Sequence, residues 1–467
     1  MHSNTPLPYA VNAATRYFAA LSDLPWAVWL DSGGRGRYDI LCAQPVTTLV
    51  THGLVTTLTT SRGTHTSSAD PFDLLRQQLG ETTVAIPDIP FAGGALGYWG
   101  YDLARRDIPL ATQALDDEQL PDMAIGIYDW AVVLDHHQHT AQLLSQHRNP
   151  ATAQQLPHIL ERLLHQASLP ELSQPELSQP KLTQSGFKIH GRIHSNFSRA
   201  TYENAFNIAQ QYLHDGDCYQ VNLAQRYEAA ASGDALPAYL ELRQMSPAPY
   251  SAFMNLPQVQ ILCTSPERFL QVTNGRVETQ PIKGTRPRMN DPLQDEHMVR
   301  ELQQSEKDRA ENLMIVDLLR NDLGKSCVPG SVQVPQLFEV KSYAQVHHLV
   351  STVTGKLAPG QDAISLLKNC FPGGSITGAP KQRAMQIIEQ IEPHRRGIYC
   401  GTIGYVGYDG NMDSNIVIRT LVYAQGKIRY GAGGGIVADS EAASEYQETL
   451  DKAAAMLKLL YRFGAAD

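Results

Sequence analysis

The alternation of hydrophobic and polar positions predicts both strands and helices along the 467-residue chain. Short apolar runs typical of buried strands occupy residues 26–30 (WAVWL), 130–135 (WAVVLD) and 415–423 (NIVIRTLVY). Residues 427–437 (KIRYGAGGGIV) predict a strand that runs into a glycine turn. Apolar residues at helical spacing predict long helices over 295–322 and 441–461. Because these elements do not form regular strand–helix–strand units, the pattern favours an α+β or mixed α/β fold.

One segment differs from the rest in composition. Residues 170–184 read PELSQPELSQPKLTQ, which is three copies of a five-residue unit. Proline interrupts a helix and polar residues cannot form a core, so we predict a linker at 169–185. This linker separates a first region, 1–168, from a second region, 186–467. The total length suits two or three domains, or one large composite domain.

Composition and charge narrow the class of protein. The chain is 42% hydrophobic and 18% charged, as in ordinary soluble enzymes, and its net charge of −9 gives no reason to expect nucleic acid or an anionic membrane as a partner. No apolar stretch approaches the ~20 residues of a membrane span, and the first residues, MHSNTPLPYA, lack a signal-peptide pattern. The six cysteines are widely separated and form no CxxC pair. We therefore expect a cytoplasmic protein with reduced cysteines.

Two helices carry acidic pairs that suit a hard cation. Asp308 and Glu311 are three residues apart and share one helical face, as do Glu445 and Glu448. Carboxylate oxygens at this spacing are what Mg²⁺ prefers, although a solvated acidic face would give the same pattern.

Two glycine-rich segments are candidates for anion binding. GGSITGAPK (373–381) is not a Walker A motif, because two residues separate its last glycine from the lysine; with Thr377 it predicts either an oxyanion site at a helix start near Pro380 or a capped tight turn. GAGGGIV (431–437) allows a ligand to approach the backbone and could hold a carboxylate. Arg419, within an apolar strand, predicts either a carboxylate clamp or a structural ion pair.

Taken in order, these and neighbouring segments resemble the chorismate-utilising enzymes. The stretches that carry the resemblance are GGALGYWGYDLARR (93–106), GDCYQVNLAQR (216–226), SPERF (265–269), PIKGT (281–285), KDRAEN (307–312), LLRNDLG (318–324), VHHLVS (346–351), FPGGSITGAPK (371–381), IRT (418–420), GAGGGIVADS (431–440) and EYQET (445–449). The resemblance covers essentially the whole second region. It implies a large α/β fold in which two antiparallel sheets pack face to face with helices outside, and to which both regions contribute.

The lysine of PIKGT discriminates within this family. Anthranilate synthases usually carry alanine in this motif, whereas the aminodeoxychorismate synthases carry lysine, here Lys283. The resemblance therefore implies amination of chorismate at C4 by way of a covalent bond between Lys283 and C2, on the route to 4-aminobenzoate and folate. A lysine attacks only as the neutral amine, and the leaving hydroxyl needs a proton, for which Glu267 of SPERF matches the family's general acid/base.

The resemblance also assigns the remaining site residues. Mg²⁺ would be held directly by Glu311 and Glu448 and through water by Glu445. The enolpyruvyl carboxylate would be held by Arg419 and the backbones of Gly433, Gly434 and Gly435, and the ring site would be lined by Thr377, His348 and Lys381. Gln220 stands where isochorismate and salicylate synthases carry the lysine that activates water, which argues against water as the nucleophile.

Two further expectations follow from the family. Relatives bind tryptophan near a Leu-Leu-Glu-Ser stretch, which here reads Trp29-Leu30-Asp31-Ser32, so a tryptophan pocket is predicted at Asp31, Ser32, Pro249 and Tyr250. No glutaminase-like GxCxG site surrounds any cysteine, so ammonia is expected from solution or from a separate glutamine amidotransferase subunit. The alternatives are an anthranilate synthase component, an isochorismate synthase, and a non-catalytic subunit that binds chorismate or tryptophan.

Overall fold

The computed structural model describes residues 3–169, 186–343 and 346–466. The predicted linker at 169–185 therefore lies, except for its first residue, outside the described part. Two sheets form the centre of the molecule, and both contain only antiparallel pairs. Within the described residues, none of the helices combines the length and the apolar character that a membrane crossing requires.

The first sheet joins strands from both regions of the chain. Its strands, in spatial order, are β1 (Ser3–Leu7), β10 (Thr140–Ser145), β9 (Trp130–Asp135), β3 (Tyr38–Cys42), β2 (Ala27–Asp31), β13 (Tyr250–Leu256), β14 (Val259–Ser265), β23 (Thr420–Ala424), β24 (Lys427–Ile436), β12 (Gln220–Ser232) and β11 (Lys188–Ser195), with β20 (Gly378–Ala379) beside β12. The regions meet where β2 pairs with β13, in a register that sets Asp31 opposite Ser251.

The second sheet is mixed in the same way. Its order is β17 (Ile282–Pro287), β19 (Val346–Lys356), β16 (Arg276–Thr279), β15 (Arg268–Thr273), β22 (Met412–Asn415), β21 (Thr402–Gly407), β7 (Gly94–Trp99), β8 (Met123–Tyr128), β4 (Thr47–His52), β5 (Val55–Thr60) and β6 (Gly63–Ser67), with β18 (Gln333–Ser342) also beside β19. Here the regions meet where β7 pairs with β21, Trp99 opposite Thr402. The prediction that both regions build one body is confirmed.

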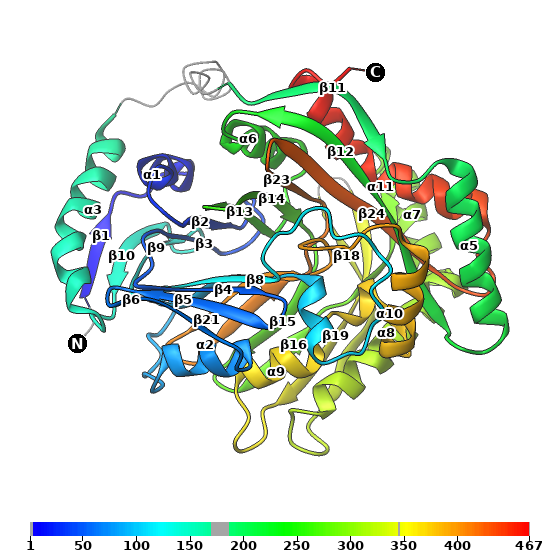
Figure 1. Ribbon diagram of the computed structural model, residues 1–467, viewed down its shortest axis with the longest axis horizontal. Helices are drawn as coiled ribbons and strands as arrows, with labels where there is room; N and C mark the ends of the chain where they lie inside the picture. Colours follow the sequence, from blue (N-terminus) through cyan, green and yellow to red (C-terminus); the bar gives the residue numbers. More distant parts are fainter. Residues whose placement is uncertain (1–2, 170–185, 344–345, 467) are drawn as a thin grey trace.

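Helices cover the outer faces of the two sheets (Figure 1). The first sheet is covered by α1 (Ala13–Leu21), α3 (Pro150–Ser168), α6 (Leu236–Met245) and α11 (Ala442–Arg462), and α5 (Arg199–His214) packs beyond β12. The second sheet is covered by α2 (Pro71–Leu79), α7 (Pro292–Gln304), α8 (Glu306–Gly324) and α9 (Ala363–Cys370), with 3-10 turns at Tyr101–Arg106 and Gly374–Ile376, whereas α10 (Lys381–Ile391) packs against β12 of the first sheet and against α5. A separate apolar core, which includes Val28, Leu96 and Ile261, fills the space between the sheets.

Three predicted elements differ from the structure. The helix predicted at 295–322 is two helices, because the Ser305 side chain accepts the backbone N–H of Asp308 and caps α8. The strand predicted at 415–423 is broken, because the chain leaves the second sheet after Asn415 and enters the first at Thr420, turning at Arg419 with φ +49°. The glycines predicted to form a turn at 431–437 stay in β24. The strands at 26–30 and 130–135 and the helix at 441–461 are confirmed.

Candidate active site

Lys283 is brought beside Glu311 by a local irregularity in β17. The register between β17 and β19 shifts between Lys283 and Thr285, around Gly284, whose φ is +77°. A Cβ on Gly284 would lie 2.8 Å from the side chain of Asp308, so glycine is what lets α8 approach this strand. The result is a distance of 3.8 Å between Lys283 Nζ and Glu311 Oε2, with both side chains largely buried.

Glu267 is a buried carboxyl group within the electrostatic range of Lys283. It lies between β14 and β15 and is 6% exposed. Burial raises the pKa of Glu267 to about 7, while a hydrogen bond with Ser375 and the charges of Lys283 and Lys452 act in the opposite direction. A group with this pKa can both give and take a proton near neutral pH, as a general acid/base requires.

The three glutamates assigned to a metal gather at the end of β24. Glu445 accepts a hydrogen bond of 2.7 Å from the Ser440 hydroxyl, and the Lys307 ammonium lies 3.9 Å from Glu445 and 4.0 Å from Glu311. A Cβ on Gly434 would lie 3.0 Å from Glu445 Oε2 and 3.2 Å from Glu448 Oε1, so the glycine leaves room for both carboxylates. Burial raises the pKa of Glu311 and of Glu445.

Lys452 forms an ion pair with Glu448, the third of these carboxylates. Although burial acts in the opposite direction, the ammonium of Lys452, 2.6 Å from Glu448, lowers the pKa of that group. In the described part of the chain, no three acidic, histidine or cysteine side chains are arranged closely enough to enclose a metal ion. Carboxylate oxygens are nevertheless the donors that Mg²⁺ prefers, and the ammonium groups of Lys307 and Lys452 balance their charge. The donor chemistry therefore fits Mg²⁺, and the metal site stays a prediction.

The glycine strand and Arg419 border the same region. A Cβ on Gly435 would lie 2.9 Å from the side-chain amide of Gln220, and neither the amide oxygen nor the nitrogen of that fully buried group has a hydrogen-bond partner. Arg419 makes no ion pair within 4 Å with any carboxylate of the described residues, so the alternative of a structural ion pair has no support there. Burial lowers the pKa of Arg419, an effect that the charge of Glu267 opposes.

His348, Thr377 and Lys381 differ in what they contact. Burial lowers the pKa of His348 to about 4, and its Nδ1 lies 2.9 Å from the Thr285 hydroxyl, so the imidazole is neutral at physiological pH. Thr377 is buried and donates to the carbonyl of Gly373. Lys381 is bound to Asp322 at 2.7 Å and joins α10 to α8. The substrate contacts assigned to these three residues stay predictions.

The residues of the predicted tryptophan pocket also come together. Asp31, Pro249 and Tyr250 line a cavity of about 970 Å³ between the sheets. The Asp31 carboxylate is already bound by Arg243 and by the Tyr239 hydroxyl, whereas the buried Ser32 hydroxyl has no partner. The structure thus places these residues side by side without testing whether tryptophan binds.

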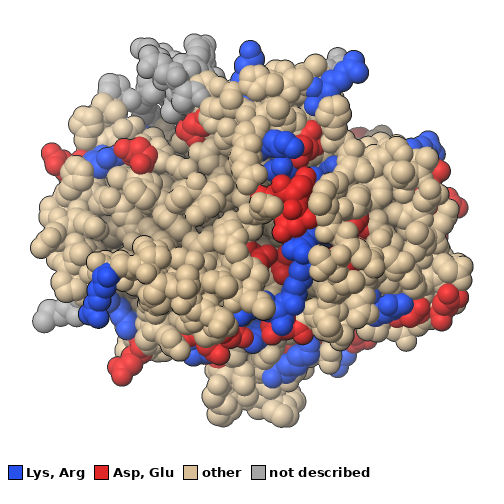
Figure 2. All heavy atoms as spheres, viewed as in Figure 1, with Lys and Arg blue, Asp and Glu red and all other residues tan. Residues whose placement is uncertain are grey.

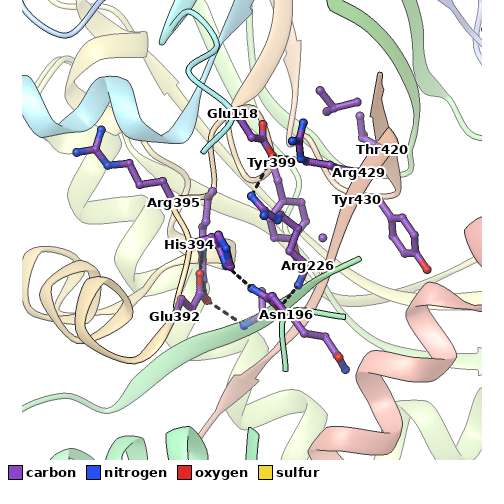
Figure 3. Close-up of a pocket in the computed structure, with 15 residues that line it drawn as sticks. Glu118, Asn196, Arg226, Glu392, His394, Arg395, Tyr399, Thr420, Arg429 and Tyr430 are labelled. Carbon is purple, nitrogen blue, oxygen red and sulfur yellow. Dashed lines mark hydrogen bonds and ion pairs between the residues drawn. The ribbon is translucent and has the colours of Figure 1, made fainter. Parts of the chain in front are cut away.

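A second polar cavity holds none of the predicted site residues (Figure 3). It measures about 30 Å³, and its ionic groups are committed to one another: Arg226 pairs with Asp117, and Arg429 pairs with Glu228. Burial raises the pKa of Glu118, which lies between these two arginines, to about 7. We interpret the cavity as part of a structural ionic network that joins β12 and β24 of the first sheet to the loop around residues 117–118.

On the face shown in Figure 2, acidic and basic side chains mix in one central band, so this face offers no large patch of a single sign.

Sequence reasoning missed three residues of the site. Ser375 contacts Glu267, Lys307 bridges two glutamates, and Lys452 binds Glu448 and donates to the Gly433 carbonyl at 2.9 Å. The signal was present, because each stands in or beside a matching stretch: Ser375 in FPGGSITGAPK, Lys307 in KDRAEN and Lys452 just after EYQET.

Comparisons with known proteins identify the family of this chain. The family described as chorismate binding enzyme matches residues 26–458. The chain is 49% identical over 453 residues to "Aminodeoxychorismate synthase component 1" of Klebsiella aerogenes, with 96% of each chain covered, and 48% identical over 456 residues to the protein of that name in Escherichia coli, again with 96% of each covered. It is 37% identical over 445 residues to "Anthranilate synthase component 1" of Thermus thermophilus, with 95% of this chain and 94% of that one covered.

A solved structure supports the same conclusion. Anthranilate synthase component I from Streptococcus pneumoniae TIGR4 superposes with a TM-score of 0.79 at 32% identity, over 90% of this chain and 92% of the other. The predicted fold, two large antiparallel sheets with helices outside, is thereby confirmed. The chain belongs to the chorismate-binding enzymes, and relatives that share nearly half its residues over almost its full length are the enzyme subunits named aminodeoxychorismate synthase component 1.

Proposed function

We propose that this chain aminates chorismate at C4 with ammonia and forms 4-amino-4-deoxychorismate through a covalent bond to Lys283. One observation carries the proposal: Lys283, the residue by which the aminating branch differs from anthranilate synthases, lies 3.8 Å from Glu311 and within the electrostatic influence of the buried Glu267. The proposed nucleophile and the proposed acid/base group therefore influence each other within one site.

In the first step, the neutral Lys283 amine forms a bond to C2 while the C4–OH bond breaks. Protonated Glu267 supplies the proton, and the hydroxyl leaves as water. In the second step, ammonia forms a bond to C4, the bond between C2 and Lys283 breaks, and Lys283 leaves as the neutral amine. The new C4 ammonium group returns a proton to Glu267, so the sum is chorismate plus ammonia giving aminodeoxychorismate plus water.

The substrate's two carboxylates would be held at different places. Arg419 and the backbone of Gly433–Gly435 would bind the enolpyruvyl carboxylate, in a region without a competing ion pair to Arg419 among the described residues. Glu311 and Glu448, with Glu445 through water, would hold Mg²⁺ against the ring carboxylate. When bound, this ion would supply Lewis-acid withdrawal of electrons through that carboxylate.

The source of ammonia is proposed to be a separate glutamine amidotransferase subunit. The relatives' name, component 1, implies a partner component. With purified chain alone, glutamine should give no turnover, whereas an ammonium salt should. Turnover from glutamine without a partner would contradict this part of the proposal.

Product identification tests the function. The purified chain is incubated with chorismate, Mg²⁺ and an ammonium salt at alkaline pH. The products are separated by chromatography and identified by mass spectrometry. Aminodeoxychorismate without pyruvate is the expected result. Anthranilate with pyruvate would overturn the proposal in favour of an anthranilate synthase, and no metal-dependent turnover would favour a binding subunit.

A further inference from the structure

We propose that Arg35, which lies in the first region of the chain, recruits the anionic substrate at the mouth of the active site. The inference rests on the proposed function, because it concerns access to that site. Arg35 lines a narrow cavity of about 70 Å³ whose other lining residues include His348 and Arg419. Arg35 is exposed, whereas His348 is buried, so the cavity runs from the surface toward the predicted substrate residues.

The turn that carries Arg35 is held in place by several contacts. The backbone N–H groups of Arg35 and Gly36 donate to the Ser32 carbonyl at 2.8 and 3.2 Å. Gly33 has φ +58°, and a Cβ there would lie 2.5 Å from the Ala248 carbonyl oxygen, so the turn packs directly on the segment that forms the opposite wall. The Gly33 N–H donates to Asp31 at 2.7 Å.

This turn is also held by side chains of the second region that bind Asp31. The Asp31 carboxylate that receives the Gly33 N–H is fully buried among side chains that bind it, with the Tyr239 hydroxyl at 2.7 Å. A rigid turn presents its side chain from a constant position, which lowers the ordering cost when a ligand binds.

The charge of Arg35 is available to a ligand. Within 4 Å it has no carboxylate among the described residues, whereas its neighbour Arg37 is paired with Asp135 at 2.8 Å and with Asp88 at 3.1 Å. Arg419 has no such partner either, so two uncommitted guanidinium groups line one passage. The chain as a whole has a net charge of −9 and repels an anion with two carboxylates, so local positive charge along the route favours its entry.

This position assigns Arg35 to capture of the substrate rather than to chemistry. An exposed charge attracts an anion over a distance that salt shortens, about 8 Å at physiological ionic strength. Loss of the charge should therefore lower kcat/KM and weaken its salt dependence, while kcat stays near the parent value.

The test compares Arg35→Gln, Arg35→Lys and Arg62→Gln in the full chain with chorismate, Mg²⁺ and an ammonium salt. Arg62, exposed in the turn between β5 and β6, is the matched control, because it also lacks a carboxylate partner among the described residues. For Arg35→Gln we expect kcat/KM to fall about 10-fold at low salt with kcat unchanged, and the difference from the parent to shrink as salt rises. Arg35→Lys should recover most of kcat/KM, and Arg62→Gln should match the parent.

Equal kcat/KM and equal salt dependence in Arg35→Gln and the parent would overturn the inference. It would also fail if kcat fell as much as kcat/KM, or if tryptophan binding weakened while chorismate binding did not. Calorimetric titration with chorismate separates this inference from the proposed function. The parent could bind chorismate but form no product, while Arg35→Gln binds chorismate more weakly than the parent. That result would refute the proposed function and support the role of Arg35. A parent that does not bind chorismate would refute both.

Discussion

The Lys283 amine lies 3.8 Å from the Glu311 carboxylate, and this contact joins the predicted nucleophile to a predicted metal ligand. One carboxylate oxygen cannot bind the ammonium group and a metal ion with full strength at the same time. In the proposed function, occupation of Glu311 by Mg²⁺ would therefore compete with the ion pair that now holds Lys283. Removal of either group is expected to disturb the other, and the predictions for Lys283 and for the metal ligands separate their contributions.

Replacement of the proposed nucleophile should stop the reaction. In Lys283→Ala we expect the rate of aminodeoxychorismate formation to fall by about 10³-fold or more, because no other group can form the bond to C2. The rate is measured by chromatography with saturating ammonium salt. Lys356→Ala, at the exposed end of β19, serves as the control and should keep the parent rate. If Lys283→Ala kept a tenth of the parent activity, covalent catalysis would be excluded.

The pH dependence should report Glu267. Because burial raises its pKa to about 7, the acid form that protonates the leaving hydroxyl is present below this pH and is lost above it. The need for neutral Lys283 is common to the parent and to Glu267→Gln. The ratio of their rates, each expressed per concentration of free ammonia, should therefore decline as pH rises through about 7. Glu267→Gln should lower the rate by about 10²- to 10⁴-fold.

Ser375→Ala gives a subtler check of the same group. The hydrogen bond from Ser375 opposes the effect of burial on Glu267, so its removal should raise the pKa further and move the decline to higher pH. A pH profile identical to that of the parent would show that Glu267 is not the group that titrates.

Metal dependence should follow two glutamates. In Glu311→Gln and Glu448→Gln, the Mg²⁺ concentration for half-maximal activity should rise at least about 10-fold, since each loses a charged donor. Removal of Mg²⁺ by a chelator should abolish turnover of the parent. Glu306→Gln, exposed in the first turn of α8, should titrate like the parent. Direct titration of Mg²⁺ by calorimetry gives a second measure, and equal affinity in all four proteins would rule out this metal site.

A buried ion pair near the site should dominate local stability. Arg396 donates to Glu392 at 2.6 Å and to the Ile376 carbonyl at 2.7 Å, and both ionic side chains are almost fully buried. Arg396→Met leaves Glu392 buried without its partner, and we expect a loss of about 3–5 kcal/mol in the free energy of unfolding. The exposed pair Arg300–Glu296 provides the contrast, since Arg300→Met should cost no more than about 0.5 kcal/mol. Thermal unfolding followed by calorimetry distinguishes the two.

Local sequence signals predicted much of this site, because its chemistry is concentrated in short stretches. Glu445 and Glu448 could be placed on one helix from spacing alone, and α11 is where the pattern predicts it. The break at Ser305 was also readable, since a serine followed three residues later by Asp308 is a capping signal. The spacing of residues could not show that α8 and β17 approach each other at Gly284.

Two other features depend on tertiary structure and were not predictable from periodicity. The run 415–423 is mostly apolar because most of it is buried, and its polar residues, Asn415, Arg419 and Thr420, do not by themselves reveal that the chain crosses from one sheet to the other. The glycines of β24 look like a turn in sequence. They remain a strand because residues 431–436 pair continuously with β12. Gly434 and Gly435 lack a Cβ because one would come within 3.2 Å of the Glu445, Glu448 or Gln220 side chains.

The pairing of β2 with β13 and of β7 with β21 has a consequence for how the protein is made in a cell. A ribosome delivers β2 and β7 long before β13 and β21 exist, so the nascent first region emerges with two apolar sheets that each have an unpaired edge. Neither sheet can complete its strand pairing until most of the chain has been translated. Folding must therefore be largely post-translational and slow, and we expect the newborn chain to depend on chaperones that cover these edges.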